Sequence, residues 1–268
     1  MRRITTLAVA FAGACLAATA FATPLPNSAV LHLRVFNDCP TSILTTTNSF
    51  PGTVYVYDQN EVAPFCAGFA NMHTWRFSTD GINPIGFLNG DTFEYSCTYM
   101  MTGIGGEGGL SLAPWWSPDP DGLFNCRTTD GEIACFGGRM PFFSFTAAFG
   151  IHYVAGTPIQ LGISYLPNGL SNVSPASVVY NVRYASINYT SGLLNFDEGN
   201  PAECCDTSPP HGLWGALSQW YAGGQMKMFV QTIGQPHSAV GTWNDIQYTS
   251  GPTAAKKSSW GQIKQLYR

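Results

Sequence analysis

The chain has 268 residues with 12 basic and 16 acidic side chains, giving a net charge of −4, and charged residues make up only 10% of it. This balance argues against a nucleic-acid-binding surface, because such surfaces gather lysine and arginine. Sparse charge together with 29 glycines, 18 prolines and 13% aromatic residues is typical of a secreted all-β domain with many turns.

Residues 1–22 have the order of features found in a secretory signal peptide. Arg2 and Arg3 precede an apolar run over 7–18, and Ala20-Phe21-Ala22 offers the small residues that precede a cleavage site. We therefore expect cleavage before Thr23 and a secreted protein, whether extracellular, on the cell surface or periplasmic. The alternative for residues 1–22 is a buried N-terminal helix. No later apolar run approaches the ~18 residues of a membrane helix, so no transmembrane segment is predicted.

The mature chain is expected to keep an odd number of cysteines. The sequence has eight, and Cys15 lies within the predicted signal. Exported proteins usually pair their cysteines as disulfides. At least one cysteine is therefore left as a thiol or bonded to another chain.

Alternating apolar and polar residues predict β-strands along the chain. In 158–166 the residues Ile159, Leu161 and Ile163 alternate with Gln160 and Gly162, as in a strand with one face on a core. The other predicted strands cover 31–36, 53–58, 140–149, 177–184, 225–231 and 242–248. No segment of useful length before the chain's end has a helical period. The pattern predicts one all-β domain over 23–250, a two-sheet antiparallel jelly-roll sandwich.

The segment 113–138 predicts a β-hairpin that places two cysteines opposite each other. If Asp130-Gly131 is a two-residue turn, Cys126 faces Cys135 in a non-hydrogen-bonded pair, with Cα atoms ~4.5 Å apart. That separation lies at the short end of disulfide geometry. A Cys126–Cys135 disulfide is the first interpretation, and two unbonded neighbours are the alternative.

The order of strands and aromatic residues resembles the concanavalin A-like lectin and glucanase superfamily. The stretches that carry the resemblance are HTWRFSTDG (73–81), GLSLAPWWSPDPDG (109–122), YVAGTPIQLGISYLPNG (153–169), and GLWGALSQWYAGGQMKMFVQ (212–231) with TWNDIQY (242–248). The resemblance implies a jelly-roll sandwich with a concave sheet on which saccharides lie. It also implies that a Ca²⁺ ion sometimes holds a loop.

Exposed aromatic rings beside carboxylates are candidates for carbohydrate binding, because a sugar ring offers an apolar face and a rim of hydroxyls. Trp115 and Trp116 are adjacent on a strand, so at most one of them faces a ligand while the other packs in the core. The alternative is that neither ring contacts a ligand, because one packs in the core and the other packs beneath a loop. The full candidate set for carbohydrate binding is Trp115, Trp116, Asp119, Asp121, Trp220 and Tyr221.

Asp119, Asp121 and Asp130 are candidate ligands for Ca²⁺, which prefers hard oxygen donors. The sequence Pro-Asp-Pro-Asp-Gly lacks the spacing of a full calcium loop, and aspartate before glycine is also ordinary turn chemistry. The alternative expectation is therefore that no cofactor is bound.

No catalytic motif appears in the sequence. The Glu-x-Asp-x-Glu run of laminarinase-type members of the superfamily is missing, and so are Gly-x-Ser-x-Gly, His-Glu-x-x-His and Cys-x-x-Cys. Glu107 is a lone acid among glycines. Such an acid is a candidate for hydrolysis, but it is equally typical of a solvated turn. The histidines are scattered singly and are expected to be structural. These departures favour a protein that is not an enzyme.

The residues 251–268 form a basic C-terminal tail. Ser259-Trp260-Gly261-Gln262 matches a capping box that could open a short helix, and such a tail either frays or serves docking, sorting or surface anchoring.

Taken together, the sequence predicts a secreted protein that binds a polysaccharide or glycan without catalysis. The alternatives are a glycan-degrading hydrolase or polysaccharide lyase on the same fold, and a surface or extracellular structural protein.

Overall fold

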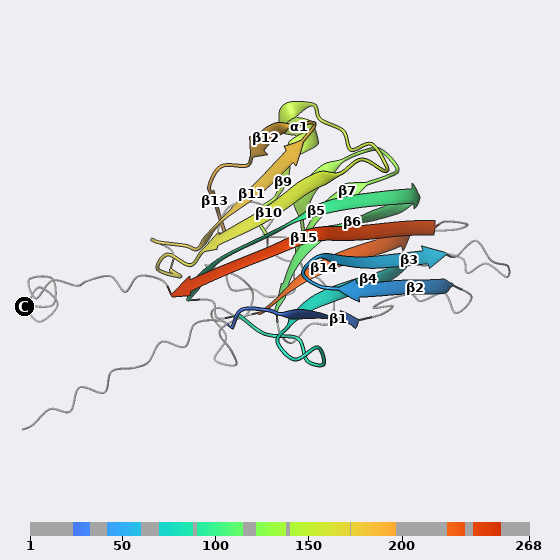
Figure 1. The fold of residues 1–268 in the computed structure, drawn as a ribbon. Coiled ribbons are helices and arrows are strands. Elements are labelled where there is room, and N and C mark those ends of the chain that lie inside the picture. The colour runs from blue at the N-terminus through green and yellow to red at the C-terminus, as the bar shows by residue number, and fades with distance from the viewer. Residues whose placement is uncertain are drawn as a thin grey trace, which may run out of the picture.

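The computed structural model describes residues 24–32, 42–59, 70–87, 90–114, 122–137, 140–171, 173–196, 224–233 and 238–252. These residues form two antiparallel β-sheets that lie one behind the other as a sandwich (Figure 1). In the described part of the chain, no helix has the length and apolar character needed to cross a membrane. The predicted fold class, an all-β two-sheet antiparallel jelly-roll sandwich, is confirmed.

The first sheet, sheet A, has seven strands among the described residues. Its order is β1-β4-β14-β6-β7-β8-β9. The strands are β1 (Ser28–His32), β4 (Ala70–Ser78), β6 (Gly106–Pro114), β7 (Gly122–Arg127), β8 (Ile133–Phe136), β9 (Phe143–Ser144) and β14 (Gly224–Ile233).

The second sheet, sheet B, has eight strands in the same described ranges. Its order is β12-β11-β10-β5-β15-β3-β2, with β13 paired to β11. The strands are β2 (Ile43–Ser49), β3 (Thr53–Gln59), β5 (Asp91–Ile104), β10 (Ile159–Leu166), β11 (Ser177–Tyr184), β12 (Ile187–Thr190), β13 (Leu194–Asn195) and β15 (Ser238–Pro252).

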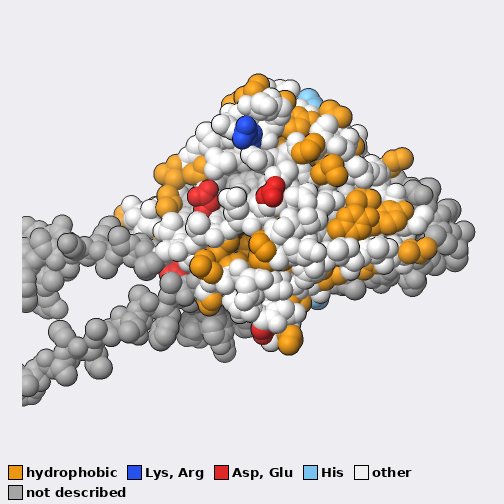
Figure 2. All heavy atoms as spheres, in the orientation of Figure 1, with side chains coloured by type: hydrophobic (Ala, Val, Ile, Leu, Met, Phe, Trp, Pro, Cys, Tyr) orange, Lys and Arg blue, Asp and Glu red, His pale blue; other side chains and the backbone are white. Residues whose placement is uncertain are grey.

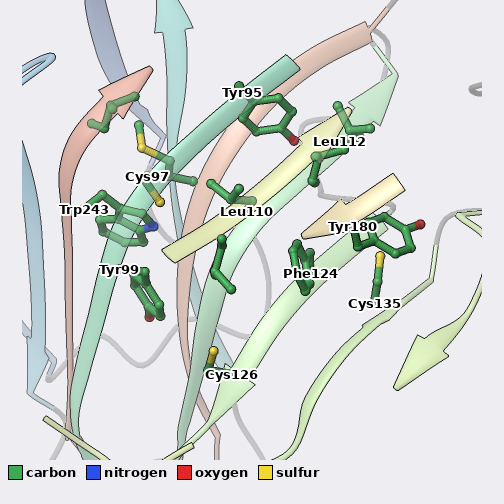
Figure 3. Close-up of a cluster of buried hydrophobic side chains, with 14 of the residues drawn as sticks. Tyr95, Cys97, Tyr99, Leu110, Leu112, Phe124, Cys126, Cys135, Tyr180 and Trp243 are labelled. Carbon is green, nitrogen blue, oxygen red and sulfur yellow. The ribbon is translucent and has the colours of Figure 1, made fainter. Parts of the chain in front are cut away.

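The core lies between the sheets and is built from one face of each strand. On β10, Ile159, Ile163 and Tyr165 are buried, as the alternation predicts. Figure 3 shows Tyr99 and Trp243 among the packed side chains. Their ring centroids are 5.2 Å apart, and the Trp243 indole N–H donates a 2.9 Å hydrogen bond to the Gly109 carbonyl. The indole therefore buries its apolar surface without leaving its polar group unsatisfied.

A buried polar network joins the two sheets at a second point. Asp58 on β3 of sheet B accepts hydrogen bonds from Asn71 (2.9 Å) and Thr232 (2.8 Å) of sheet A. His73 Nε2 lies 3.1 Å from the same carboxylate oxygen, and all four side chains are sealed from solvent. Burial by itself would raise the pKa of Asp58, but its interactions with His73, Asn71 and Thr232 outweigh burial and lower that pKa.

The predicted strand over 140–149 is wrong for most of its length. Only Phe143–Ser144 is a strand, and the helix α1 (Phe145–Phe149) follows at once. Ser144 caps this helix by accepting a hydrogen bond from the Ala147 N–H, and Gly150 ends it at φ 66°. The capping residues on both sides select a single helical turn over the strand that alternation favours.

The predicted disulfide is also wrong, because the hairpin has a different register. Cys126 pairs with Ile133, and Cys135 pairs with Phe124. The Arg127 N–H donates to the Glu132 carbonyl (3.0 Å), so the loop spans 128–131 and is two residues longer than predicted. Both cysteines are buried thiols with no disulfide between them, and Figure 3 shows them well apart. Burial raises the pKa of the Cys126 thiol.

Candidate functional site

An open groove of about 660 Å³ lies on the outer face of sheet B. Five neighbouring strands, β12, β11, β10, β5 and β15, supply its floor and walls. Figure 2 shows this face, where polar, uncharged groups fill the centre and acidic and basic side chains stand apart from one another. The lining residues include Glu94, Ser96, Thr98, Gln160, Gly162, Asn181, Arg183, Asn188, Tyr189, Thr190, Asp245 and Gln247.

Strand register arranges these side chains in rows that run across the sheet. Because alternate residues of a strand share a face, the polar members of each alternating strand all point out of the sandwich. One row contains Thr98, Gln160, Arg183 and Asn188. The next contains Gln247, Ser96, Gly162, Asn181 and Thr190.

The groove is lined by a glycine on its central strand, β10. Gly162 has no side chain and is flanked by Ser96 on one strand and Asn181 on the other. A Cβ placed at Gly162 would lie 3.5 Å from the Ser96 Cβ and 3.8 Å from the Asn181 Cβ, which is ordinary van der Waals contact. The backbone there needs no glycine, so what the glycine provides is open space above the sheet.

A β-bulge sets one wall of the groove. The register of β15 against β5 shifts between Asn244 and Gln247, and Asp245 within the bulge has φ 51°. The bulge is held by hydrogen bonds from the Asp245 N–H to the Gly52 carbonyl (2.9 Å) and from the Ile246 N–H to the Pro51 carbonyl (3.0 Å). Aspartate tolerates this left-handed backbone conformation better than most residues. The bulge makes Asp245 part of the groove lining.

The polar side chains of the groove are not engaged with one another. Among the residues that the structure describes, four lining amides make no side-chain hydrogen bond, namely Gln160, Asn181, Asn188 and Gln247. The charged groups of Glu94, Arg183 and Asp245 likewise have no described hydrogen-bond or ion-pair partner. All of these donors and acceptors are therefore open to a ligand.

The aromatic ring at the β12 end belongs to the core side of the sheet. Tyr189 on β12 is among the groove-lining residues, but it is the register partner of the buried Val182, so its side chain is on the core face of sheet B. Its ring packs against Phe149 of α1, with centroids 5.2 Å apart.

The outer face of sheet A carries a different polar cluster, which is buried. Glu107 on β6 accepts a 3.0 Å hydrogen bond from Asn125 on β7, and Gln231 on β14 is the register neighbour of Glu107. Glu107 is 7% exposed and belongs to a strand, which excludes the alternative of a solvated turn. Burial raises the pKa of Glu107, Asp130 and Glu132 add to the rise, and Arg127 and Asn125 oppose it.

We expect Glu107→Gln to stabilise the protein above neutral pH by on the order of 1 kcal/mol, the usual size of a single-site change. A carboxyl whose pKa is raised by folding destabilises the folded state progressively as pH rises through that pKa. The glutamine oxygen can still accept from Asn125. Thermal denaturation should therefore show a gain in Tm at pH 8 that shrinks towards pH 4. A gain that is equal at both pH values would contradict the buried-charge explanation.

The residues singled out from the sequence lie largely outside the described ranges. This holds for Trp115, Trp116, Asp119, Asp121, Trp220 and Tyr221, for residues 1–22 and for 253–268. Asp130 is described, and its carboxylate binds Arg127 Nε at 3.0 Å and the Glu132 N–H at 3.0 Å. No group of three metal-ligating side chains occurs within the described residues. Calcium at Asp119 and Asp121 stays a prediction.

The groove residues were missed because the sequence reasoning followed the buried face of each strand. On β5, which was not predicted, Phe93, Tyr95 and Cys97 face the core and alternate with Glu94 and Ser96. The same alternation that locates the core therefore also marks the outward set. What the sequence lacks is the pairing of β5 with β10 and β15, which assembles that set into one site.

No family model and no curated protein matches the chain. Among solved structures, it is similar to alginate lyase AlgAT5 of polysaccharide lyase family 7, with 8% identity, coverage of 82% of this chain and 94% of that one, and a TM-score of 0.47. An alginate lyase from Corynebacterium sp. has 9% identity, coverage of 81% and 83%, and a TM-score of 0.40. Arcelin-5, a lectin-like defence protein from Phaseolus vulgaris, has 11% identity, coverage of 84% and 99%, and a TM-score of 0.36.

Identities this low and TM-scores below 0.5 carry no argument about this chain. Its own two antiparallel sheets agree with the concanavalin A-like resemblance at the level of the fold. Its function has to be argued from its own side chains, because one fold hosts many functions.

Proposed function

We propose that this chain is an exported protein that binds carbohydrate in the groove of sheet B and does not cleave it. The observation that carries the proposal is the set of unengaged amides, Gln160, Asn181, Asn188 and Gln247, facing one hollow. Each amide offers both donors and an acceptor, and so does each sugar hydroxyl. A face that leaves so many such groups without partners suits a ligand rich in hydroxyls.

The groove also offers charged acceptors. Glu94 and Asp245 supply carboxylate oxygens that accept hydrogen bonds from hydroxyls, and such charge-assisted bonds are stronger than neutral ones. Amides and carboxylates on one open face are the kind of placed polar groups that fix the orientation of a ligand.

The geometry of the acids supports binding without hydrolysis. A glycosidase holds its two carboxyl groups ~5–9.5 Å apart. Asp245 follows Asn244, the register partner of Thr98, so its backbone position lies roughly 10–13 Å along the strand direction from that of Glu94 on the neighbouring strand, which is wider than such a pair. Histidine, the residue that most often acts as a general base, is not among the described groove-lining residues.

The test is a glycan array followed by titration calorimetry and analysis of the sugar after incubation. We expect saturable binding with no new reducing or unsaturated ends. Asn181→Ala should weaken binding by about 2–10-fold, because it removes a hydrogen bond with a net contribution of ~0.5–1.5 kcal/mol. Val173→Ala, at a residue 94% exposed and outside the groove, is the control and should leave the affinity unchanged. Absence of binding on the whole array would refute the proposal.

A glycan-degrading activity is the second candidate, and it attaches to the other sheet. A carboxyl group with a raised pKa, such as that of Glu107, has the property required of a general acid. The test is to incubate the glycan with the unmodified protein and with the Glu107→Gln variant. New reducing or unsaturated ends that only the unmodified protein produces would favour this candidate over binding alone.

A further inference from the structure

We propose that the groove is specific for an uncharged oligosaccharide and discriminates against polyuronates and other acidic glycans. The inference rests on the proposed function and adds to it the chemical class of the ligand. It is drawn from the charges that line the groove and from their spacing.

The groove carries more negative than positive charge. Glu94 and Asp245 contribute carboxylates, and Arg183 is the one basic residue in the described lining. A chain of uronates brings one negative charge with each sugar unit, so it meets repulsion along the side formed by β5 and β15. An uncharged sugar meets the same carboxylates as hydrogen-bond acceptors.

The single arginine does not neutralise the acids. Asp245 lies on β15 and follows Asn244, which is the register partner of Thr98. Three strand spacings separate β15 from β11, so the backbone positions of Asp245 and Arg183 are ~14 Å apart. Glu94 lies two strands from Arg183 and four residues along the strand direction, or ~16 Å in all. Both separations exceed the Debye length of ~8 Å at physiological ionic strength. The acidic side therefore acts on a ligand without compensation.

The dimensions favour a chain of sugars over a single ring. The groove crosses the sheet from β15 to β12, four strand spacings or ~19 Å. A ligand that spans the groove thus contacts carboxylates on β5 and β15 and the amides of Asn181 and Asn188 on β11 and β12.

The test compares uncharged and uronate oligosaccharides of equal length by calorimetry at low and at high ionic strength. We expect the uncharged ligand to bind at least 10-fold more tightly at low salt, with a smaller difference at high salt because salt screens the repulsion. The variant Glu94→Gln/Asp245→Asn should narrow the difference by improving uronate binding. Asparagine is chosen at 245 because it also adopts positive φ readily.

Val173→Lys is the matched control, since it makes the net charge more positive on an exposed turn that does not line the groove. In this variant, the ratio of the affinity for the uncharged oligosaccharide to that for the uronate should equal the ratio in the unmodified protein. Tighter binding of the uronate, or a ratio unaffected by the double variant, overturns this inference while the proposed function stands. Absence of binding by both ligands overturns the proposed function and this inference with it.

Discussion

Asp58→Ala is expected to lower the free energy of unfolding by about 3–5 kcal/mol, the cost of breaking a buried pair by removing one partner. The substitution takes away the acceptor shared by Asn71 and Thr232 and the carboxylate beside His73, all of which are sealed from solvent. It therefore leaves buried donors without their partner on the opposite sheet. For a domain of this size the loss corresponds to a fall in Tm of about 6–20 °C.

The effect should depend on pH in a defined direction. Because folding lowers the pKa of Asp58, its stabilising contribution is present above the unfolded pKa of ~3.9 and is lost as pH falls through the folded pKa. The difference between the variant and the unmodified protein should be largest near neutral pH and shrink below pH 3.9. Asp58→Asn, which keeps an acceptor oxygen, should lose less stability than Asp58→Ala.

Urea denaturation at several pH values measures this difference. Glu94→Gln serves as the control, since Glu94 is exposed and its side chain has no described partner, and it should change stability by less than about 0.5 kcal/mol. Equal denaturation midpoints for Asp58→Ala and the unmodified protein would show that the network does not hold the sheets together.

Gly162→Leu is expected to abolish glycan binding, with an affinity at least 100-fold lower, while the protein stays folded. The new side chain projects into the groove between Ser96 and Asn181. Its Cβ meets only ordinary contacts, and the backbone at 162 does not require positive φ. The loss therefore comes from filled space and not from a distorted strand. Gly162→Ala should have an intermediate effect.

Gly251→Leu is the matched control for this experiment. Gly251 on β15 also lies on the outer face of sheet B, has open space where a Cβ would lie, and does not line the groove. Calorimetric titration of all three glycine variants, with circular dichroism to confirm folding, separates blocking of the groove from loss of structure. Retained binding by Gly162→Leu would place the ligand elsewhere on the molecule.

The strands themselves could be predicted from the sequence where alternation was regular. The patterns over 53–58, 177–184, 225–231 and 242–248 fall within strands, and that over 158–166 matches β10 from its second residue on. Prediction failed where local capping or turn chemistry overrode the pattern. Ser144 and Gly150 make a helix of a segment that alternates, and the four-residue loop 128–131 moves Cys135 away from Cys126.

The buried network and the groove could not be predicted in the same way. In the sequence, Asp58 is only the last residue of the predicted strand over 53–58. The packing of β3 against β4 and β14 is what makes it a contact between the sheets. Glu94, Gln160 and Asn181 come from three separate segments, and nothing local in any of them indicates a shared site.

The amino-acid sequence by itself determined that the chain forms alternating strands, and therefore which side chains face a core and which face outward. The physical reason is that alternation is a property of each strand's own backbone, with a period of two. The tertiary structure alone decided which outward side chains meet. Rows across a sheet depend on hydrogen-bond register between strands far apart in the chain, and a shift of one residue would turn a whole set of side chains to the other face.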